Sequence, residues 1–135
     1  MSHRVPQAPL VLIVDDFDDA LDIYQQYLTF KGYRVLTASS GAEAIATARQ
    51  HNPALILMDL SMAVMTGTEA MRILRNDAMF SLVPIVAFTA HALEDERVTA
   101  LRAGFDEVIP KPCLPDELVT AVERLLATGR GVELS

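Results

Sequence analysis

The chain has 135 residues, of which 51% are hydrophobic, with a formal net charge of −7 and one cysteine, Cys113. This length fits a single domain with a sizeable core, and one cysteine excludes an internal disulfide framework or a cysteine-rich metal site. The negative charge argues against direct binding to nucleic acid or to an anionic membrane. The apolar runs are too short to cross a bilayer and there is no secretory signal, so we expect a cytoplasmic protein.

Five short apolar runs rich in β-branched residues predict five strands. Four of them are apolar almost throughout, which is typical of strands buried on both faces of a parallel sheet. The second run is less regular and fits an edge strand. The predicted strands are Leu10–Val14, Tyr33–Thr37, Leu55–Met58, Pro84–Phe88 and Glu107–Ile109.

Helical patterns follow the first two strands. The first pattern places apolar residues three and four positions apart as far as Leu28, and Gly32 stands where a glycine typically ends a helix. The second pattern begins with a capping-box sequence from Ser40 to Glu43 and stops before Pro53. These two patterns predict helices on both sides of the irregular second strand in the sequence.

Three further helical patterns follow the remaining strands. One starts near Gly67. The next has its apolar side between Leu93 and Leu101 and ends at Gly104. The last, Pro115–Leu126, opens with a proline at a first-turn position, where this residue is favoured.

Strand and helix therefore alternate five times, which predicts an α/β fold with a doubly wound parallel sheet. Right-handed crossovers leave few topologies, and we expect the flavodoxin-like five-stranded sheet in order 2-1-3-4-5 with five helices. The expected domain covers residues 10–127, between a flexible N-terminus at 1–9 and a loose tail at 128–135. No linker or second domain is indicated.

Polar residues stand at the ends of four predicted strands. Asp15 and Asp16 follow the first strand, Asp59 the third and Thr89 the fourth, and Lys111 comes just after the fifth. Ligands of such folds bind beyond the carboxyl ends of the strands. We therefore expect these five residues to converge on one crevice.

The chemistry of this set points to phosphoryl transfer. Three close carboxylates repel one another, and a hard divalent cation such as Mg²⁺, which prefers oxygen ligands, relieves that repulsion. One carboxylate can then attack a phosphoryl group, while Lys111 and Thr89 suit the phosphoryl oxygens. The acidic turn from Asp15 to Asp19 has no glycine, which argues against a nucleotide-binding loop.

These motifs resemble those of the response-regulator receiver family of two-component and phosphorelay signalling. The resemblance covers about Leu10 to Leu126. It is carried by four motifs in the family's order and spacing. They are Val14-Asp15-Asp16, Met58-Asp59-Leu60-Ser61-Met62 with Gly67 eight residues beyond Asp59, Phe88-Thr89-Ala90, and Lys111-Pro112.

The resemblance implies a role for each site residue. Asp59 would be the phosphoacceptor, with Thr89 and Lys111 contacting the phosphoryl group. The implied cofactor is Mg²⁺, with Mn²⁺ as a substitute. Its ligands would be Asp16, Asp59, the backbone carbonyl of Ser61 and, mainly through water, Asp15. The Lys111–Pro112 peptide bond is expected to be cis.

The sequence also departs from the family pattern. Ala63 replaces a usual proline, and Val108 replaces the aromatic residue three positions before the lysine, which normally moves inward when the threonine shifts. Cys113 stands where phenylalanine is more common, and we expect it to be a small packing residue. Ser61 and His91 occupy positions that tune the lifetime of the phosphate in the family.

The leading hypothesis is a signalling switch rather than a turnover enzyme. The expected partners are a sensor histidine kinase or histidine phosphotransfer protein as donor, and a downstream protein on the face of the fourth helix, fifth strand and fifth helix. No contact with nucleic acid or membrane is expected. A free-standing regulator is preferred over a shuttle or an excised receiver.

Two other functions remain open from the sequence. One is a Mg²⁺-dependent phosphohydrolase with an aspartyl nucleophile, although Ser61 occupies the position where such enzymes usually carry a second aspartate. The other is a binding module that keeps the fold but no longer switches, which the missing aromatic at Val108 supports.

Overall fold

A five-stranded parallel sheet forms the centre of the computed structural model, which describes residues 8–16, 18–60, 62, 64–90 and 92–128, with the backbone alone at 18–20. The strand order is β2-β1-β3-β4-β5, so the predicted topology is confirmed. The less regular β2 lies at the edge, as expected. The strands are β1 (Leu10–Val14), β2 (Arg34–Ala38), β3 (Leu55–Asp59), β4 (Ile85–Thr89) and β5 (Glu107–Pro110).

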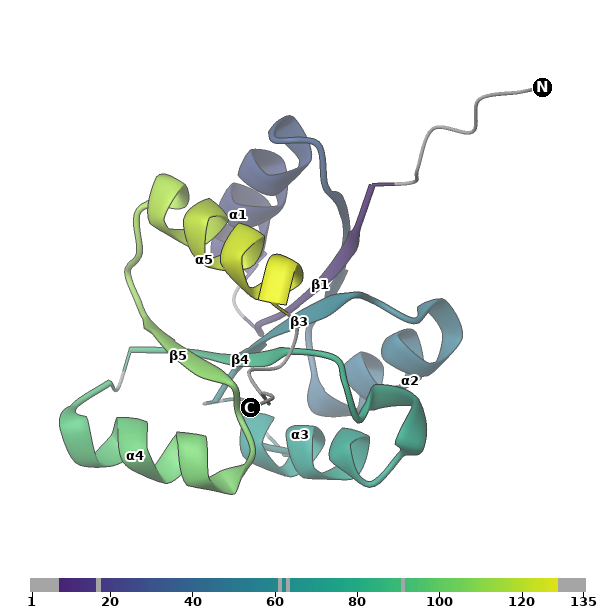
Figure 1. Ribbon diagram of the computed structural model, residues 1–135, viewed down its shortest axis with the longest axis vertical. Helices are drawn as coiled ribbons and strands as arrows, with labels where there is room; N and C mark the ends of the chain where they lie inside the picture. The colour runs from purple at the N-terminus through teal and green to yellow at the C-terminus, as the bar shows by residue number, and fades with distance from the viewer. Residues whose placement is uncertain (1–7, 17, 61, 63, 91, 129–135) are drawn as a thin grey trace.

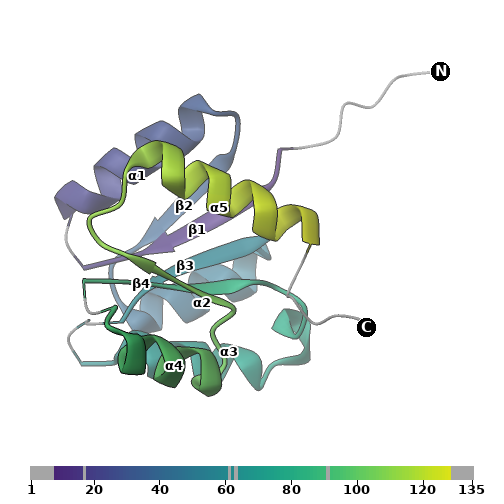
Figure 2. The same cartoon turned by 60° about the vertical axis from the view of Figure 1, so that its left-hand side comes forward.

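Helices cover both faces of the sheet. Figures 1 and 2 show α1 and α5 on one face and α2, α3 and α4 on the other. None of the helices in the described part of the chain combines the length and apolar character needed to span a bilayer. The helices are α1 (Asp18–Phe30), α2 (Gly41–His51), α3 (Gly67–Arg75), α4 (Glu94–Ala103) and α5 (Pro115–Thr128), with a short 3₁₀ helix η1 (Ala78–Phe80).

Alternation along the central strands divides the core into two clusters. In β1, Val11 and Ile13 pack under α1 and α5, whereas Leu12 and Val14 pack on the side of α2 and α3. Successive residues of a strand point to opposite faces, and helices cover both faces here, so a continuous apolar run results. This explains why the central strands appear in the sequence as unbroken hydrophobic segments.

The bounds of four strands differ from the prediction by one residue at one or both ends, and β2 and β5 end at Ala38 and Pro110. The strand β3 includes Asp59, which pairs with Phe88, and β4 includes Thr89, which pairs with Pro110. Because these residues still belong to the hydrogen-bonded sheet, their side chains start from a rigid backbone. Pro84, which the sequence assigned to the fourth strand, precedes β4.

The helix caps are partly as expected. Ser40 caps α2 by accepting a hydrogen bond from the Glu43 N–H, but the Glu43 carboxylate accepts from the Ser39 N–H at 2.8 Å. The capping box predicted at α2 is therefore only half correct, because the Glu43 carboxylate binds the N–H of Ser39 and not that of the N-cap residue Ser40. A complete box is present instead at α3, between Thr66 and Glu69.

The fourth helix is packed less well than the sequence suggested. Leu93 is the N-cap residue and is 72% exposed, and Leu101 is 38% exposed. Among the residues of α4, all of which are described, only Ala100 is buried. The predicted apolar side is therefore largely wrong, and α4 is attached to the domain through little buried surface.

A buried ion pair fastens the end of the sheet where β4 begins. The Arg75 guanidinium donates to Asp106 Oδ2 at 2.6 Å and to the carbonyls of Phe80 and Val83 at 2.8 Å. Asp106 Oδ2 also accepts from the Ile85 N–H at 2.9 Å. Because the side chains of Arg75 and Asp106 are only 14% and 8% exposed, this network joins α3, η1 and the start of β4 and β5 away from solvent.

Replacing Arg75 with methionine should destabilise the fold strongly. The variant removes the guanidinium that donates to the Asp106 carboxylate and to the carbonyls of Phe80 and Val83, and breaking a buried pair in this way costs about 3 kcal/mol or more. The measurement is the free energy of unfolding in urea, followed by circular dichroism.

Arg49→Met is the matched control, because Arg49 pairs with Asp77 at 3.3 Å while its side chain is 49% exposed. An exposed pair of this kind contributes less than about 1 kcal/mol. Equal losses in the two variants would contradict the assignment of a buried network around Arg75.

Candidate functional site

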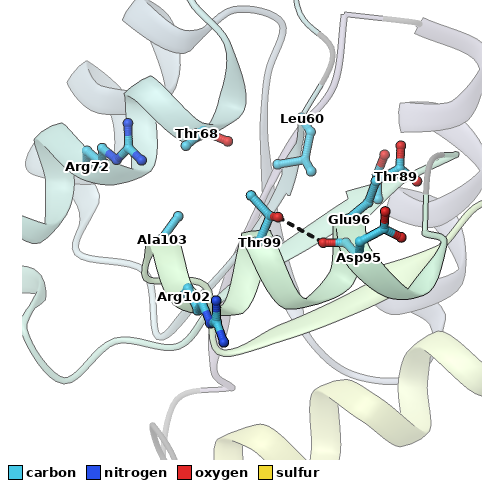
Figure 3. A pocket seen from close by; sticks show the side chains of 10 residues that line it. Leu60, Thr68, Arg72, Thr89, Asp95, Glu96, Thr99, Arg102 and Ala103 are labelled. Atoms are coloured by element: carbon cyan, nitrogen blue, oxygen red, sulfur yellow. Dashed lines mark hydrogen bonds between the residues drawn. The ribbon is translucent and has the colours of Figure 1, made fainter.

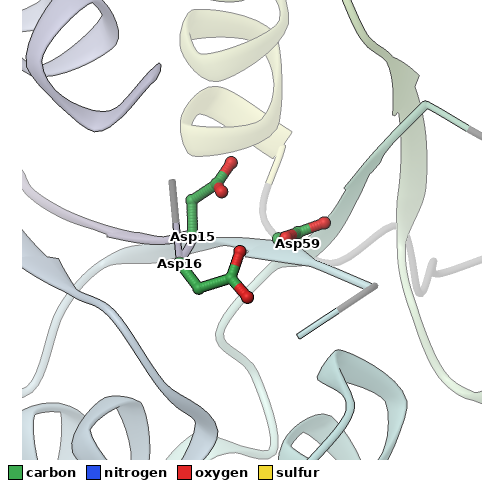
Figure 4. Close-up of side chains that lie close together, drawn as sticks. All are labelled: Asp15, Asp16 and Asp59. Atoms are coloured by element: carbon green, nitrogen blue, oxygen red, sulfur yellow. The ribbon is translucent and has the colours of Figure 1, made fainter. Parts of the chain in front are cut away.

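Three carboxylates gather at the carboxyl ends of two neighbouring strands. Asp15 and Asp16 follow β1, and Asp59 ends β3. Each offers an oxygen atom, and these atoms all lie within 4.8 Å of one another (Figure 4). Asp15 and Asp59 are 2% and 5% exposed, whereas Asp16 is exposed. The predicted convergence of the acidic residues is therefore confirmed.

The ammonium group of Lys111 lies against two of these carboxylates. Its Nζ is 2.6 Å from Asp15 Oδ2 and 3.7 Å from Asp59 Oδ1. The Lys111 N–H donates to the Thr89 carbonyl at 2.8 Å, which fixes the backbone from which the side chain starts. The Lys111–Pro112 bond is cis, as expected. A buried carboxylate requires a compensating charge, and Lys111 supplies it to both.

An aromatic ring lies against the ammonium group of Lys111, a contact that the sequence patterns did not predict. Lys111 Nζ lies 5.3 Å from the centroid of the Phe88 ring, a cation–π distance. The Tyr24 ring meets Phe88 edge-on at 5.0 Å, and the Tyr24 hydroxyl donates to the Cys113 carbonyl at 3.3 Å. The sequence contained one signal for this contact. Phe88 directly precedes Thr89 in β4, and successive residues of a strand point to opposite faces, so Phe88 has to lie on the face opposite Thr89.

Thr89 lies on the face of the sheet covered by α3 and α4. It is 1% exposed and lines one end of a cavity of about 750 Å³ between these two helices (Figure 3). Leu60, the residue after Asp59, lines the same cavity, as does Ala100 of α4. Thr89 therefore connects the carboxylate crevice with the loosely packed helix α4.

The remaining predicted positions give a mixed picture. Val108 is 5% exposed and belongs to the core cluster on the side of α2 and α3, so a small aliphatic residue fills the place where the family usually has an aromatic one. Ser61, Ala63 and His91 lie outside the described residues. The roles expected for Ser61 and His91 stay predictions.

Cys113 is a partly buried packing residue next to this site. It packs against the core cluster under α1 and α5, as expected. Burial, together with the nearby carboxylate of Glu117, raises the pKa of its thiol above the usual value. A raised pKa reduces the thiolate fraction at neutral pH, so Cys113 is a poor nucleophile.

The loop after Asp59 approaches the backbone of Asp59 itself, and a glycine permits this. The Gly67 N–H donates to the Leu60 carbonyl at 3.2 Å, and a Cβ atom on Gly67 would lie 2.0 Å from the Asp59 carbonyl oxygen. No side chain fits at that distance. Gly67 therefore lets the first turn of α3 press against the end of β3 and hold Asp59 in place.

Gly67→Ala should lower the free energy of unfolding by about 2 kcal/mol or more, because the backbone at Asp59 has to move. Gly32→Ala is the control, since Gly32 has a φ of +102° but nothing within 4 Å of an added Cβ. That control should cost about 1 kcal/mol through backbone strain alone. Urea unfolding and the amide chemical shift of Asp59 measure both effects, and an unmoved Asp59 resonance in Gly67→Ala would contradict the contact.

Comparison with protein families matches residues 11–123 to the response regulator receiver domain. A curated relative is the transcriptional regulatory protein PrrA of Mycobacterium tuberculosis, 39% identical over 119 residues, which make up 88% of this chain and 50% of that protein. Another is the hybrid signal transduction histidine kinase D of Dictyostelium discoideum, 36% identical over 124 residues, or 92% of this chain and 8% of that protein.

Solved structures of similar fold include the receiver domain of the sensor histidine kinase PA1611 of Pseudomonas aeruginosa, described with a magnesium ion coordinated in its active-site cleft. Its TM-score is 0.82 at 31% identity, with 89% of this chain and 98% of that chain covered. The chemotaxis protein CheY4 of Vibrio cholerae has a TM-score of 0.83 at 29% identity, with 87% and 98% covered.

The chain spans about half the length of the transcriptional regulators that it matches. Because these relatives are regulators of transcription, they give no support to the expectation that nucleic acid is not a partner. The family match covers most of the chain and agrees with the sheet order and the carboxylate–lysine cluster. The chain belongs to the response regulator receiver domain family of two-component signalling.

Proposed function

We propose that this chain accepts a phosphoryl group on Asp59 from the phosphohistidine of a sensor histidine kinase or a histidine phosphotransfer protein. The observation that carries the proposal is the buried Asp59 carboxylate, held at the end of β3 between two further aspartates and the Lys111 ammonium. A carboxylate at the end of a buried strand, surrounded by charges, fits a reacting group better than a structural one.

The proposed step is a direct transfer. An Asp59 carboxylate oxygen forms a bond to phosphorus, and the bond between phosphorus and the histidine nitrogen breaks. The electron pair of the broken bond stays on the imidazole, which is protonated on its other nitrogen and leaves as a neutral ring. Asp59 becomes an acyl phosphate.

The three carboxylates fit a divalent metal ion. Their oxygens lie close enough to share one ion, and carboxylate oxygen is a ligand that Mg²⁺ and Mn²⁺ both prefer. We propose that Asp15, Asp16 and Asp59 hold Mg²⁺, with Mn²⁺ as a substitute. When bound, the ion would offset the negative charge that accumulates on the phosphoryl oxygens.

Lys111 and Thr89 bind the transferred group in this proposal. The ammonium lies 3.7 Å from Asp59 Oδ1, so a small displacement brings it to a phosphoryl oxygen. Thr89, on the neighbouring strand β4, would donate its hydroxyl hydrogen from the opposite side of the crevice. Thr89 belongs to β4, and the Lys111 backbone is hydrogen-bonded to Thr89. The sheet therefore sets the distance between these two residues.

The proposed output is a change of protein contacts rather than turnover of a substrate. We propose the face of α4, β5 and α5 as the contact surface for a downstream protein. A shallow cavity of about 400 Å³ on this face is lined by Ile109, Cys113 and Asp116, next to the ion pair of Arg124 with Glu107 at 2.6 Å. The weak packing of α4 beside Thr89 supports a two-state helix there, since little buried surface resists its displacement.

Asp59→Asn should abolish phosphorylation while leaving the fold intact. With Mg²⁺ and acetyl phosphate, the wild-type chain should gain the mass of one phosphoryl group, and the variant should not, because an amide is not a nucleophile toward phosphorus. The matched control is Asp22→Asn, an exposed carboxylate of α1 away from the crevice. An equal mass gain in Asp59→Asn and in the wild type would sink the proposal.

A further inference from the structure

The cavity between α3 and α4 exists because α4 lines it with small side chains. These are Thr99, Ala100 and Ala103, at the three- and four-residue spacing that places residues on one face of a helix. Leu60, the residue after β3, contributes a further apolar side chain. The volume of about 750 Å³ lies within the range of small-molecule sites in proteins. A gap of this kind also gives α4 space to move, so the charges around it have to decide what it does.

Opposite charges stand at the two ends of this cavity. Arg72 of α3 and Arg102 of α4 line one end (Figure 3). Asp95 and Glu96, in the first turn of α4, line the other end, beside Thr89. Asp95 and Arg102 are two helical turns apart, which corresponds to about 10 Å. The lining between the two ends is apolar or uncharged.

The fold itself does not use the two arginines at the basic end. Both are exposed, and neither guanidinium forms an ion pair or a hydrogen bond with another residue in the described part of the chain. By contrast, Arg75, three positions further along α3, pairs with Asp106 at 2.6 Å. The chain has 18 acidic and 11 basic residues, so carboxylate partners are abundant. Two arginines left without one at the same cavity indicate that a ligand supplies the carboxylate.

A simpler explanation accounts for each arginine separately but not for the pair. Arg72 and Arg102 each lie in the last turn of their helix, where a positive charge favours the carbonyl end. That effect requires one basic residue on each helix, at any exposed position of the turn. It does not require that both line one cavity from facing helices.

The lining selects the chemistry of the ligand. Planar guanidinium groups match the two oxygens of a carboxylate. The small side chains along the middle favour an apolar body. Asp95 and Glu96 repel a second negative charge at the far end. A monocarboxylate with an apolar body therefore fits, whereas a dicarboxylate of similar length does not.

We infer that the cavity between α3 and α4 binds a small organic monocarboxylate. The carboxylate lies at Arg72 and Arg102, and the apolar body rests on Ala100 and Ala103. The site goes beyond the proposed function, because it uses none of the carboxylates that would hold the metal ion or accept the phosphoryl group. It shares Thr89 with the crevice as part of its wall.

The test titrates the isotope-labelled chain with three compounds that share a phenylbutyl body and differ in charge. 4-Phenylbutyrate has one carboxylate, 4-phenylbutanol has none, and 4-(4-carboxyphenyl)butyrate has a second one at the far end. The first should shift the amide resonances of Ala100 and Ala103 with a dissociation constant on the order of 1 mM, as expected for so small a ligand. The other two should bind at least about tenfold more weakly, since one lacks the charged group and the other meets repulsion.

The double variant Arg72→Gln, Arg102→Gln should raise the dissociation constant of 4-phenylbutyrate at least about tenfold, because both groups that bind the carboxylate are removed. Both arginines are exposed, so the variant should unfold at the same temperature as the wild type. The matched control is Arg97→Gln, an exposed arginine of α4 that does not line the cavity. It should bind 4-phenylbutyrate as the wild type does.

An absence of shifts at Ala100 and Ala103, or an equal affinity of the wild type and the double variant, would overturn the inference. An equal loss in the Arg97→Gln control would also overturn it, as would an alcohol or a dicarboxylate that binds as tightly as 4-phenylbutyrate. Asp59→Asn should bind 4-phenylbutyrate as the wild type does. A failure of this inference therefore leaves the proposed function standing, and a chain that cannot be phosphorylated leaves this site standing.

Discussion

The structure depends on how buried carboxylates are balanced at the carboxyl end of the sheet. Asp15 and Asp59 are nearly inaccessible to water, and each lies within reach of the Lys111 ammonium. That arrangement requires parallel strands of matched length and a backbone bond from Lys111 to Thr89, because a long flexible side chain does not hold its position unaided. The sheet order places β1 and β3 side by side, so that their aspartates meet. The turn after β5 and the contact with Phe88 place the Lys111 ammonium beside them.

Much of the site could be predicted because parallel strands end at a common edge. The Asp15–Asp16 pair, Asp59 and Lys111 come from three distant parts of the sequence, yet the strand order alone brings them together. The Arg75–Asp106 network could not be predicted, since it uses carbonyls of turns whose geometry no periodic pattern encodes. The packing of α4 was overestimated because apolar residues at helical spacing do not show whether a neighbouring surface exists.

The strand β4 connects the crevice to both helical layers. Phe88 points toward α1 and α5 and contacts Tyr24, whereas the next residue, Thr89, points toward the cavity beside α4. Next to Asp59, β4 therefore has one contact on each face of the sheet: Phe88 with Tyr24 on one side, and Thr89 with the cavity beside α4 on the other. Val108 lies in the core in place of an aromatic residue. Among the described residues, the aromatic ring in contact with the site lysine, Lys111, is that of Phe88.

The Arg75 network lies at the end of the sheet opposite the crevice, and this separation bears on how the protein changes over generations. The Arg75 network holds the starts of β4 and β5 without using exposed residues of the loops at the other end, such as Leu93. Substitutions of such exposed side chains leave this network intact. Duplicated copies of such a gene can diverge in the partners they recognise while the architecture that supports Asp59 is inherited intact.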